Sequence, residues 1–426
     1  MRGGRARAAL SAAPLVVLSV TVLALALAKV RAARAPRAPS STTAAAVVSL
    51  GASSAASPPI GVDEPLGPAP VSEDVTTFHG DAARTHRARG RAPRAPREKW
   101  RATLGGPVVA QPVLSRDQST VFVTSLDGKL YAVERGSGAI KWRVDLGDRA
   151  YGTPLVDEID RVYVGSDAKK LSCVRGGTIA WTLDLDGEAD TAPLLVSRDR
   201  IAITAGASIS FVTLSGEVKA RFRAKRKIFT SPALGSVDGA PVVFFGSQDH
   251  RAYAVRFDGT LAWSTDLGAD VDGGPVVTAS GVVFGTDAGN VVALDLARGE
   301  RVWSTPLGGF VRGGLTVGRD GSVLAGVYGP TPGVVRLAGA TGAIRGKFSV
   351  PGTGSRDFGV HGSPLEDDDG TLVFGAEDDR VYALERSGRL RFAVPRGGDV
   401  DAPVTLTRDG ALIIGADDGT VAELSD

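Results

Sequence analysis

A single cysteine occurs among the 426 residues of the sequence, and histidine is nearly as scarce, with four. One cysteine excludes an intrachain disulfide and therefore any disulfide-stapled fold. Cys173 stands where other copies of the repeat described below carry alanine, so we expect a small core side chain rather than a nucleophile. The histidines lack metal-ligand spacing. We expect solvated loop positions for His79, His86, His250 and His361.

Apolar residues at helical spacing are also scarce after residue 100. Short β-branched runs are found there instead, separated by Gly, Asn and Asp. Residues 275–303 are typical: Pro275–Thr278, Val282–Thr286, Val291–Asp295 and Arg301–Ser304 predict four strands joined by tight turns. The 55 glycines fit a turn-rich all-β domain.

This four-strand pattern repeats with an aromatic residue in the last strand of each copy. The aromatic positions are 39 to 45 residues apart: Trp142, Trp181, Phe222, Trp263, Trp303, Phe348 and Phe392, preceded by Trp100. A proline opens the first strand in Pro112, Pro154, Pro193, Pro232, Pro275, Pro364 and Pro403. A glycine ends the second strand in Gly165, Gly206, Gly246, Gly285, Gly326, Gly375 and Gly415. A period near 40 is that of a four-stranded propeller blade.

The two ends of the repeat region decide the number of blades. The last copy stops after three strands, whereas Trp100 has an aromatic strand with no three strands before it. Pairing Glu98–Leu104 with the C-terminal strands completes one blade and removes exposed sheet edges. The sequence therefore predicts an all-β, eight-bladed β-propeller of four-stranded antiparallel blades, closed by strands from both ends, which we expect to be a monomeric ring.

The repeat resembles a known family. Two stretches, Ala132 to Trp142 and Ala293 to Trp303, are similar to the tryptophan-docking repeat of pyrroloquinoline-quinone (PQQ)-type propellers. Residues 78–85 (FHGDAART) are similar to the lead-in before the first blade of such proteins. The resemblance implies eight blades in which each tryptophan packs on the next blade. The family includes quinone-dependent dehydrogenases and non-catalytic scaffolds such as the propeller lipoprotein of the outer-membrane barrel assembly machine.

The resemblance implies no active site here. Dehydrogenases of the family hold the quinone on the ring axis with calcium, an adjacent-cysteine disulfide and a catalytic aspartate; this chain cannot form the disulfide, and calcium ligands cannot be mapped onto it. Repeated acidic turns such as Asp127-Gly128 are hairpin turns by their place in the repeat. The cluster Asp367–Asp369 lacks the glutamate of a calcium loop. We expect no catalysis, no metal and no cofactor.

The N-terminal segment of the chain predicts export. Arg2, Arg5 and Arg7 precede an uncharged stretch, Ala8–Ala28, so residues 1–28 are either a cleaved signal peptide or a signal anchor that would associate the protein with a membrane. No cysteine follows the stretch, which excludes a lipoprotein. Residues 29–77 are a disordered Ala/Pro/Ser-rich linker, and the propeller spans 78–426. We expect a periplasmic or cell-surface location.

Residues 84–99 carry seven basic residues. They suggest either an arm for an anionic surface or a solvated linker, and the linker interpretation is favoured because aromatic residues are not interleaved as nucleic-acid binding requires. We expect no nucleic-acid partner.

The loops between the fourth strand of one copy and the first strand of the next vary most. In a propeller they gather around one mouth of the central channel, where variation on a rigid ring creates binding surfaces. Ordinary solvated loops are the alternative. The predicted partner-binding residues are Lys225, Arg226, Lys227, Phe229, Asp270, Asp272, Phe310, Arg312, Phe358, Asp399 and Asp401.

The sequence thus predicts an exported, non-catalytic propeller that acts as a protein-binding scaffold at the bacterial cell envelope, with a protein or other envelope component as its partner. Two alternatives stay open. One is a PQQ-dependent oxidoreductase with a degenerate site, and the other is a sensor of a small ligand or glycan at the channel mouth.

Overall fold

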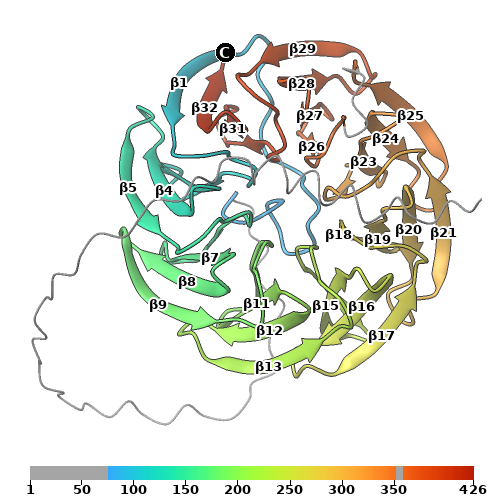
Figure 1. Ribbon diagram of the computed structural model, residues 1–426. Coiled ribbons are helices and arrows are strands. Elements are labelled where there is room, and N and C mark those ends of the chain that lie inside the picture. The colour runs from blue at the N-terminus through green and yellow to red at the C-terminus, as the bar shows by residue number, and fades with distance from the viewer. Residues whose placement is uncertain (1–74, 352–357) are drawn as a thin grey trace, which may run out of the picture. The chain divides into compact units, whose positions relative to one another are not determined.

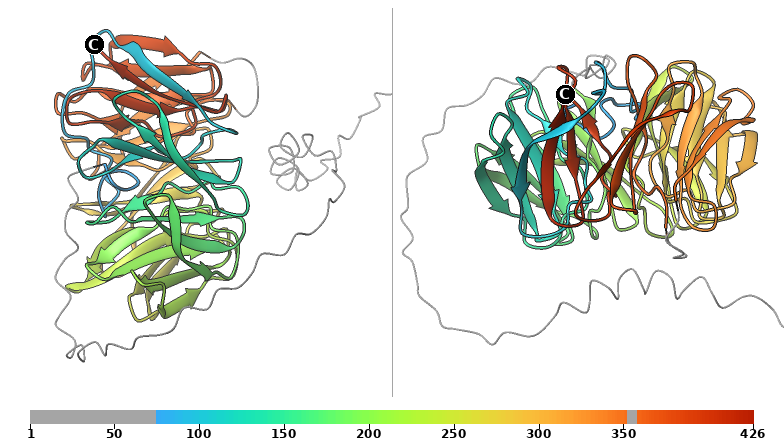
Figure 2. Two further views of the ribbon diagram at one scale, coloured as in Figure 1. Left: turned by 90° about the vertical axis from the view of Figure 1, so that its left-hand side faces the viewer. Right: turned by 90° about the horizontal axis from the view of Figure 1, so that it is seen from above.

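The computed structural model describes residues 75–351 and 358–426; the predicted signal and nearly all of the predicted linker lie outside these residues, as do Arg356 and Asp357. The described residues form 32 strands in eight antiparallel sheets of four, arranged as blades around a central axis (Figure 1). Figure 2 shows the ring from the side, with the blades next to one another around the axis. Within these ranges no helix is long and apolar enough to cross a membrane.

The blades follow chain order. Blade 1 contains β2 (Val113–Leu114), β3 (Thr120–Ser125), β4 (Lys129–Glu134) and β5 (Ile140–Asp145). Blade 2 contains β6 (Leu155–Val156), β7 (Val162–Ser166), β8 (Lys170–Arg175) and β9 (Thr178–Asp184). Blade 3 contains β10 (Leu194–Ser197), β11 (Arg200–Ala205), β12 (Ser208–Thr213) and β13 (Val218–Arg223). Blade 4 contains β14 (Ala233–Val237), β15 (Ala240–Gly246), β16 (Arg251–Arg256) and β17 (Leu261–Asp266).

The second half repeats the arrangement. Blade 5 contains β18 (Gly273–Thr278), β19 (Gly281–Gly285), β20 (Asn290–Leu294) and β21 (Arg301–Pro306). Blade 6 contains β22 (Thr316–Val317), β23 (Val323–Val327), β24 (Gly333–Leu337) and β25 (Ile344–Ser349). Blade 7 contains β26 (Leu365–Glu366), β27 (Leu372–Ala376), β28 (Arg380–Leu384) and β29 (Leu390–Pro395). Blade 8 contains β30 (Thr405–Leu406), β31 (Leu412–Gly415), β32 (Thr420–Ser425) and β1 (Arg97–Thr103).

Ring closure follows the prediction. β1 pairs antiparallel with β32, with Trp100 opposite Glu423 and Ala102 opposite Val421, so the outer strand of blade 8 comes from the N-terminal side of the chain. In Figure 1 β1 lies beside β32 at the C-terminus. This register confirms the eight-bladed, all-β fold and places the aromatic of β1 in the same position as those of the other outer strands.

Each tryptophan joins its blade to the next one. The Trp100 ring packs on Gly138 in the turn before β5, and a Cβ added to Gly138 would lie 2.8 Å from Cε3 of Trp100. Gly138 also has a φ of +75°, which favours glycine over residues with a side chain. The indole Nε1 of Trp263 donates to the Leu296 carbonyl at 2.9 Å, so packing and a hydrogen bond act together between blades. The tryptophan docking implied by the resemblance is therefore present.

The glycine near the end of most second strands is required because the loop that enters the next blade packs against it. A Cβ on Gly375 would overlap Cγ1 of Val400 in the loop entering the next blade, and Gly246 meets Val271 in the same way. In blade 3 the sequence prediction is wrong: Gly206 lies beyond β11, and Thr204 fills the slot. Thr204 is tolerated because its hydroxyl hydrogen-bonds to the Thr230 carbonyl of the next blade at 3.2 Å. Cys173 is fully buried between blades, as expected for a core residue.

Candidate functional site: a plugged channel and its mouth

Residues 75–92, called the lead-in below, occupy the centre of the ring, where Figure 1 shows them in blue. Their carbonyls accept hydrogen bonds from the first strands of blades 1, 2, 4, 5 and 6. Val75 accepts from Leu114 at 2.7 Å, Thr76 from Val156 at 2.8 Å, Ala82 from Leu234 at 2.7 Å, Ala83 from Val277 at 3.0 Å, and Thr85 from Val317 at 3.0 Å. Each of these donors is two residues after the residue that opens its strand. The lead-in therefore plugs the channel and binds inner-strand donors that would otherwise lack partners.

Arg84 is the centre of this plug, with only 1% of its surface exposed. Its guanidinium donates to the carbonyls of Pro232 at 2.9 Å, Pro193 at 3.1 Å and Phe78 at 2.6 Å, and to the Thr77 hydroxyl at 2.9 Å. Burial lowers the pKa of Arg84 to about 9, and the charge of Asp81 opposes that shift. The preferred interpretation of residues 84–99 as a solvated linker is wrong for this part, because ring carbonyls replace water around the charge.

The expectation of solvated histidines is also wrong for His79 and His86. Both are buried, and their rings stack with centroids 4.2 Å apart, while Phe78 stacks on His79 at 3.8 Å. Burial lowers the pKa of both histidines, to about 4 for His86, so both rings are neutral near pH 7. His86 lies near the carbonyls of Pro364 and Val404, at 2.7 and 3.3 Å, which ties the plug to blades 7 and 8.

The acidic cluster of blade 7 fixes the exit of the lead-in. Asp367 accepts from the backbone N–H of Ala92 at 2.9 Å, and Asp368 accepts from Gly90 at 2.7 Å. Asp367 also caps its own turn through the N–H groups of Asp369 and Thr371. Among the described residues no group of three or more His, Cys, Asp or Glu is arranged so that it could hold a metal ion.

The loops that enter the blades form the channel mouth, and they share one pattern of buried and cavity-facing residues. One residue in each of these loops is buried: Val108, Ala150, Ala189, Ile228, Val271, Val311, Val360 and Val400. It lies four residues before the strand-opening residue in blades 1 to 7 and three residues before Pro403 in blade 8. The residue that follows it lines the cavity described below in six of the eight loops. We call the eight residues in this following position the mouth ring: Val109, Tyr151, Asp190, Phe229, Asp272, Arg312, His361 and Asp401. Because the ring precedes the first strands and the plug binds inside them, the plug lies deeper along the axis.

Four of the eleven predicted site residues belong to the mouth ring: Phe229, Asp272, Arg312 and Asp401. Lys225, Arg226 and Lys227 are exposed just before it. Lys227 pairs with Glu188 at 2.9 Å and lies 5.7 Å from the Phe229 ring centroid, and Arg226 lies 3.8 Å from Asp270. Phe310 and Asp399 are half-buried beside the ring. Phe358 does not fit the prediction: it is 3% exposed and packs in the core between blades 6 and 7, against residues such as Leu324 and Phe374.

Sequence reasoning missed Tyr151, His361 and Asp190 as parts of one ring, and it missed Asp417 next to it. The signal available was positional: each ring residue directly follows the buried apolar residue of its entry loop, three residues before the strand-opening residue in blades 1 to 7 and two before Pro403 in blade 8. Burial raises the pKa of Asp190 to about 8, with Asp167 and Glu188 adding to the shift. Burial and the Asp399 charge raise the pKa of Asp401 to about 7. Burial and the charges of Asp401, Asp399 and Asp418 raise the pKa of Asp417 to about 7.

Arg312 is the positively charged residue of the mouth ring, and it already forms an ion pair within the protein. It donates two hydrogen bonds to Asp287, at 2.8 and 2.7 Å, and lies 4.9 Å from the Phe310 ring centroid. Asp272 accepts from Gln248 at 3.2 Å, while burial and the Asp287 charge raise its pKa to about 7. His361 is neutral near pH 7, since burial and then the Arg312 charge lower its pKa to about 4.

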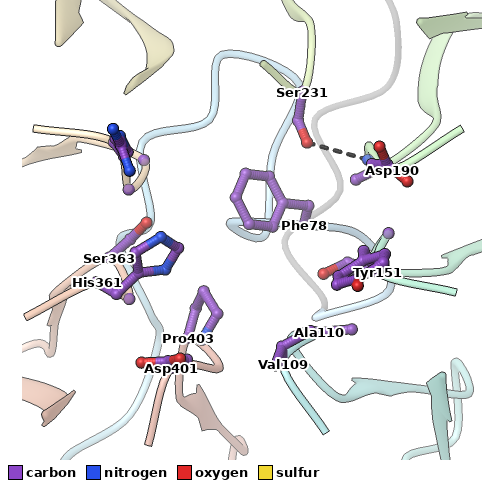
Figure 3. Close-up of a pocket in the computed structure, with 17 residues that line it drawn as sticks. Phe78, Val109, Ala110, Tyr151, Asp190, Ser231, His361, Ser363, Asp401 and Pro403 are labelled. Atoms are coloured by element: carbon purple, nitrogen blue, oxygen red, sulfur yellow. Dashed lines mark hydrogen bonds between the residues drawn. The ribbon is translucent and has the colours of Figure 1, made fainter. Parts of the chain in front are cut away.

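A cavity of about 140 Å³ lies between the mouth ring and the lead-in (Figure 3). Its wall includes Phe78, Tyr151, Asp190, Ser363 and Asp401. Figure 3 places Asp190 and Asp401 on different sides, with the Phe78 ring between them. Pockets for drug-sized ligands are typically about 300–1,000 Å³, so the cavity suits a single side-chain-sized group.

The residues present do not fit the quinone and calcium that the fold family implies. Phe78 and Arg84 of the lead-in occupy the axis, the cavity is too small for a tricyclic quinone, and Cys173 is buried in the core between blades 2 and 3. The carboxylates of the mouth ring come from different blades, and we derive no reaction step from them.

Comparison with known proteins places the chain in a family. A family model described as outer membrane protein assembly factor BamB matches residues 89–224 and 248–343, more than half of the chain. The chain belongs to this family. Its membership confirms the resemblance to PQQ-type propellers drawn from the repeat. No curated protein sequence is significantly similar.

Solved structures show the same architecture at low identity. BamB from Moraxella catarrhalis is 17% identical, covering 78% of this chain and 100% of that one, with a TM-score of 0.64. The computationally designed Ika8 protein is 18% identical, covering 76% and 99%, with a TM-score of 0.61. A europium-containing methanol dehydrogenase is 9% identical, covering 83% and 98%, with a TM-score of 0.69. This likeness shows the fold, which occurs in an assembly factor, a designed protein and an enzyme alike.

Proposed function

We propose that this protein is an exported, non-catalytic propeller that binds a protein partner at the bacterial cell envelope through its channel mouth. The observation that carries the proposal is the plug. The lead-in fills the axis, where quinone-type enzymes of the fold hold their cofactor. The mouth ring is then the part of the channel where side chains differ from blade to blade, and it is available for binding a partner. The family membership supports an assembly or scaffold role.

The mouth has the composition of a protein-binding surface. Phe229 and Phe310 are half-buried aromatics, each with a cation against its face, Lys227 and Arg312. Aromatic residues of this kind provide the buried anchors of an interface, while charges at the rim mainly steer association. Exposed Lys225 and Arg226 stand at that rim.

The test is affinity capture with the full chain from solubilised membranes, followed by binding measurements with the identified partner. Phe229→Ala and Phe310→Ala are expected to weaken binding by about 1–3 kcal/mol if each acts as an anchor. Reversing the charges of Lys225, Arg226 and Lys227 is expected to slow association at low salt. Ile140→Ala changes an exposed aliphatic residue on β5, away from the mouth loops, and is expected to leave binding unchanged.

A different result would identify a different contact. If the mouth variants bind normally and the partner is lost after Arg89, Arg91 and Arg94 are changed to alanine, the exposed arginines at the end of the lead-in and just after it are the interface. Deleting the whole segment would not test this, because it would also remove the plug. Cell fractionation tests the proposed location: full-length protein in the cytosol would contradict export. Saturable binding of PQQ with calcium would contradict the non-catalytic role.

A further inference from the structure

The polar atoms left unsatisfied in the mouth cavity can all accept a hydrogen bond. Among the described residues, Oδ1 of Asp190, Oδ1 of Asp401 and Oγ of Ser363 are buried atoms with no hydrogen-bond partner. Ser363 is only 1% exposed and lines the cavity, where Figure 3 shows it facing Phe78. Buried polar atoms are seldom left unpaired without a reason. A group that donates hydrogen bonds would satisfy all three.

The cations near the cavity are committed to other carboxylates. Arg312 binds both oxygens of Asp287, Lys227 pairs with Glu188 at 2.9 Å, and Arg149 pairs with Asp167 at 3.0 Å. No ion pair joins Asp190 or Asp401 to a cation in the described part of the chain, although the charge of Lys227 opposes the rise in the pKa of Asp190. The pKa values of both carboxyls are raised because burial and neighbouring carboxylates favour the protonated form.

We propose that the mouth cavity binds one alkylammonium or guanidinium group, as presented by a lysine or arginine side chain of the partner. This inference rests on the proposed function. The ligand would donate to Asp190, Asp401 and Ser363, while the Phe78 and Tyr151 rings would offer faces to the cation and its alkyl stem. The volume agrees: the cavity of about 140 Å³ is close to the roughly 150 Å³ that accommodates a benzene molecule.

The same chemistry could come from a free amine or from a protein side chain, and the probes separate these sources. Calorimetric titration of the full chain would use Nα-acetyl-lysine methylamide, the corresponding arginine derivative, and the norleucine derivative as a neutral control of similar shape. A second arm uses a partner peptide centred on one lysine and its norleucine version. If the cation is a partner side chain, the lysine peptide binds at least tenfold more tightly than the lysine derivative, whereas equal affinities indicate a site for free amines.

The variants test the assigned acceptors. Asp401→Asn and Asp190→Asn are each expected to weaken binding of the lysine derivative at least tenfold, and Ser363→Ala less. Asp148→Asn is the matched control, since Asp148 is exposed in a neighbouring entry loop. A melting curve for each variant excludes unfolding as the cause of lost binding.

The pH profile gives a readout that a structural role would not change. Asp399 and Asp417 face Asp401; Asp167, Glu188 and Lys227 act on Asp190; His361 and Arg312 complete the cavity. Since the cation prefers ionised carboxylates, affinity is expected to rise between pH 6 and 8.5. Binding at pH 7 is expected to release protons, measured as an enthalpy that changes with the buffer.

Three results would overturn the cation site: equal binding of the norleucine derivative, binding of calcium in place of the amines, or no binding by any probe. None of them decides the proposed function, because partner capture by the Phe229 and Phe310 variants is measured separately. Loss of the aromatic dependence with retained lysine binding would instead reject the protein-binding mouth and leave a small-amine site.

Discussion

Replacing Asp401 by asparagine should stabilise the protein at neutral and alkaline pH. Burial and the Asp399 charge raise the pKa of Asp401 from 3.8 to about 7 in the folded chain. A displacement of one pH unit corresponds to ~1.4 kcal/mol, so the ionised carboxylate costs the fold up to about 4 kcal/mol above pH 7. Asp401 keeps partial solvent exposure, which screens its charge, and we therefore expect about half of this value, ~2 kcal/mol. The variant also removes one of the charges that raise the pKa of Asp417.

The direction of the pH dependence follows from proton uptake. Between pH 4 and 7 the folded state keeps the Asp401 proton that the unfolded chain has already lost. The folded state therefore binds more protons, and this carboxyl lowers the free energy of unfolding as pH rises through that window. Below pH 4 both states are protonated and the cost disappears. Above pH 7 both are ionised and the cost is constant.

Urea unfolding of the full chain at pH 3.5, 5.5, 7 and 8.5 measures this difference, since urea does not screen charge. Asp401→Asn should match the wild type at pH 3.5 and exceed it by about 2 kcal/mol at pH 8.5. Asp148→Asn should stay within about 0.5 kcal/mol of the wild type throughout. Equal stabilisation at every pH, or destabilisation at pH 8.5, would show that Asp401 is paired in solution and would remove the charge argument for the mouth.

Three further changes test the ring and its plug. Deleting Arg97–Leu104 removes β1 and the buried Trp100 ring, and should lower Tm by roughly 10 °C or more; an unchanged Tm would mean that blade 8 closes differently. Arg84→Met leaves four acceptors unpaired and should cost about 3–5 kcal/mol by urea unfolding, whereas Arg91→Met, at an exposed ion pair, should cost less than about 1 kcal/mol. Gly375→Ala should cost about 2 kcal/mol or more because its Cβ meets Val400, while Gly346→Ala, with open space around it, should be close to neutral; equal effects would contradict the packing.

The repeat allowed the fold to be predicted because each recurring residue makes the same local contact in every blade that carries it. The aromatic of the outer strand docks on a turn glycine of the next blade, and Trp100 therefore identified β1 as the missing strand of blade 8. The error at Gly206 has a physical cause as well. Thr204 meets the same requirement as glycine by hydrogen bonding to Thr230, so the slot does not depend on glycine alone.

The plug could not be predicted from its composition. Histidine, aspartate and arginine in a glycine-containing stretch are typical of solvated chain, and an arginine is almost never fully buried unless it is paired. Its burial depends on the inner strands, whose free N–H and C=O groups face the channel only after the ring has closed. A requirement of this kind belongs to the assembled ring and leaves no periodic signal in residues 75–92.

The mouth was located in the correct loops, but single side chains were assigned less well. Asp270 and Asp272 are two residues apart on either side of buried Val271, and only Asp272 belongs to the mouth ring. A shift of one residue turns an inward side chain into a loop anchor or a rim charge. Phe358 differs in another way, since an aromatic in an entry loop became part of the core. Taking the residue that follows the buried apolar residue of each loop would have separated Asp272 and Asp401 from Asp270 and Asp399.

The unpaired mouth carboxyls connect the stability prediction to the binding proposal. An ionised Asp401 without a counter-charge costs the fold free energy, and the rest of the ring offsets that cost. A bound ammonium group would remove it, so the same free energy becomes available to binding in the pH range where the proton is lost. The two experiments must then agree: saturating lysine derivative should flatten the stability of the wild type between pH 5.5 and 8.5, and it should leave Asp401→Asn unchanged. Flattening in both proteins would place the cation elsewhere on the ring.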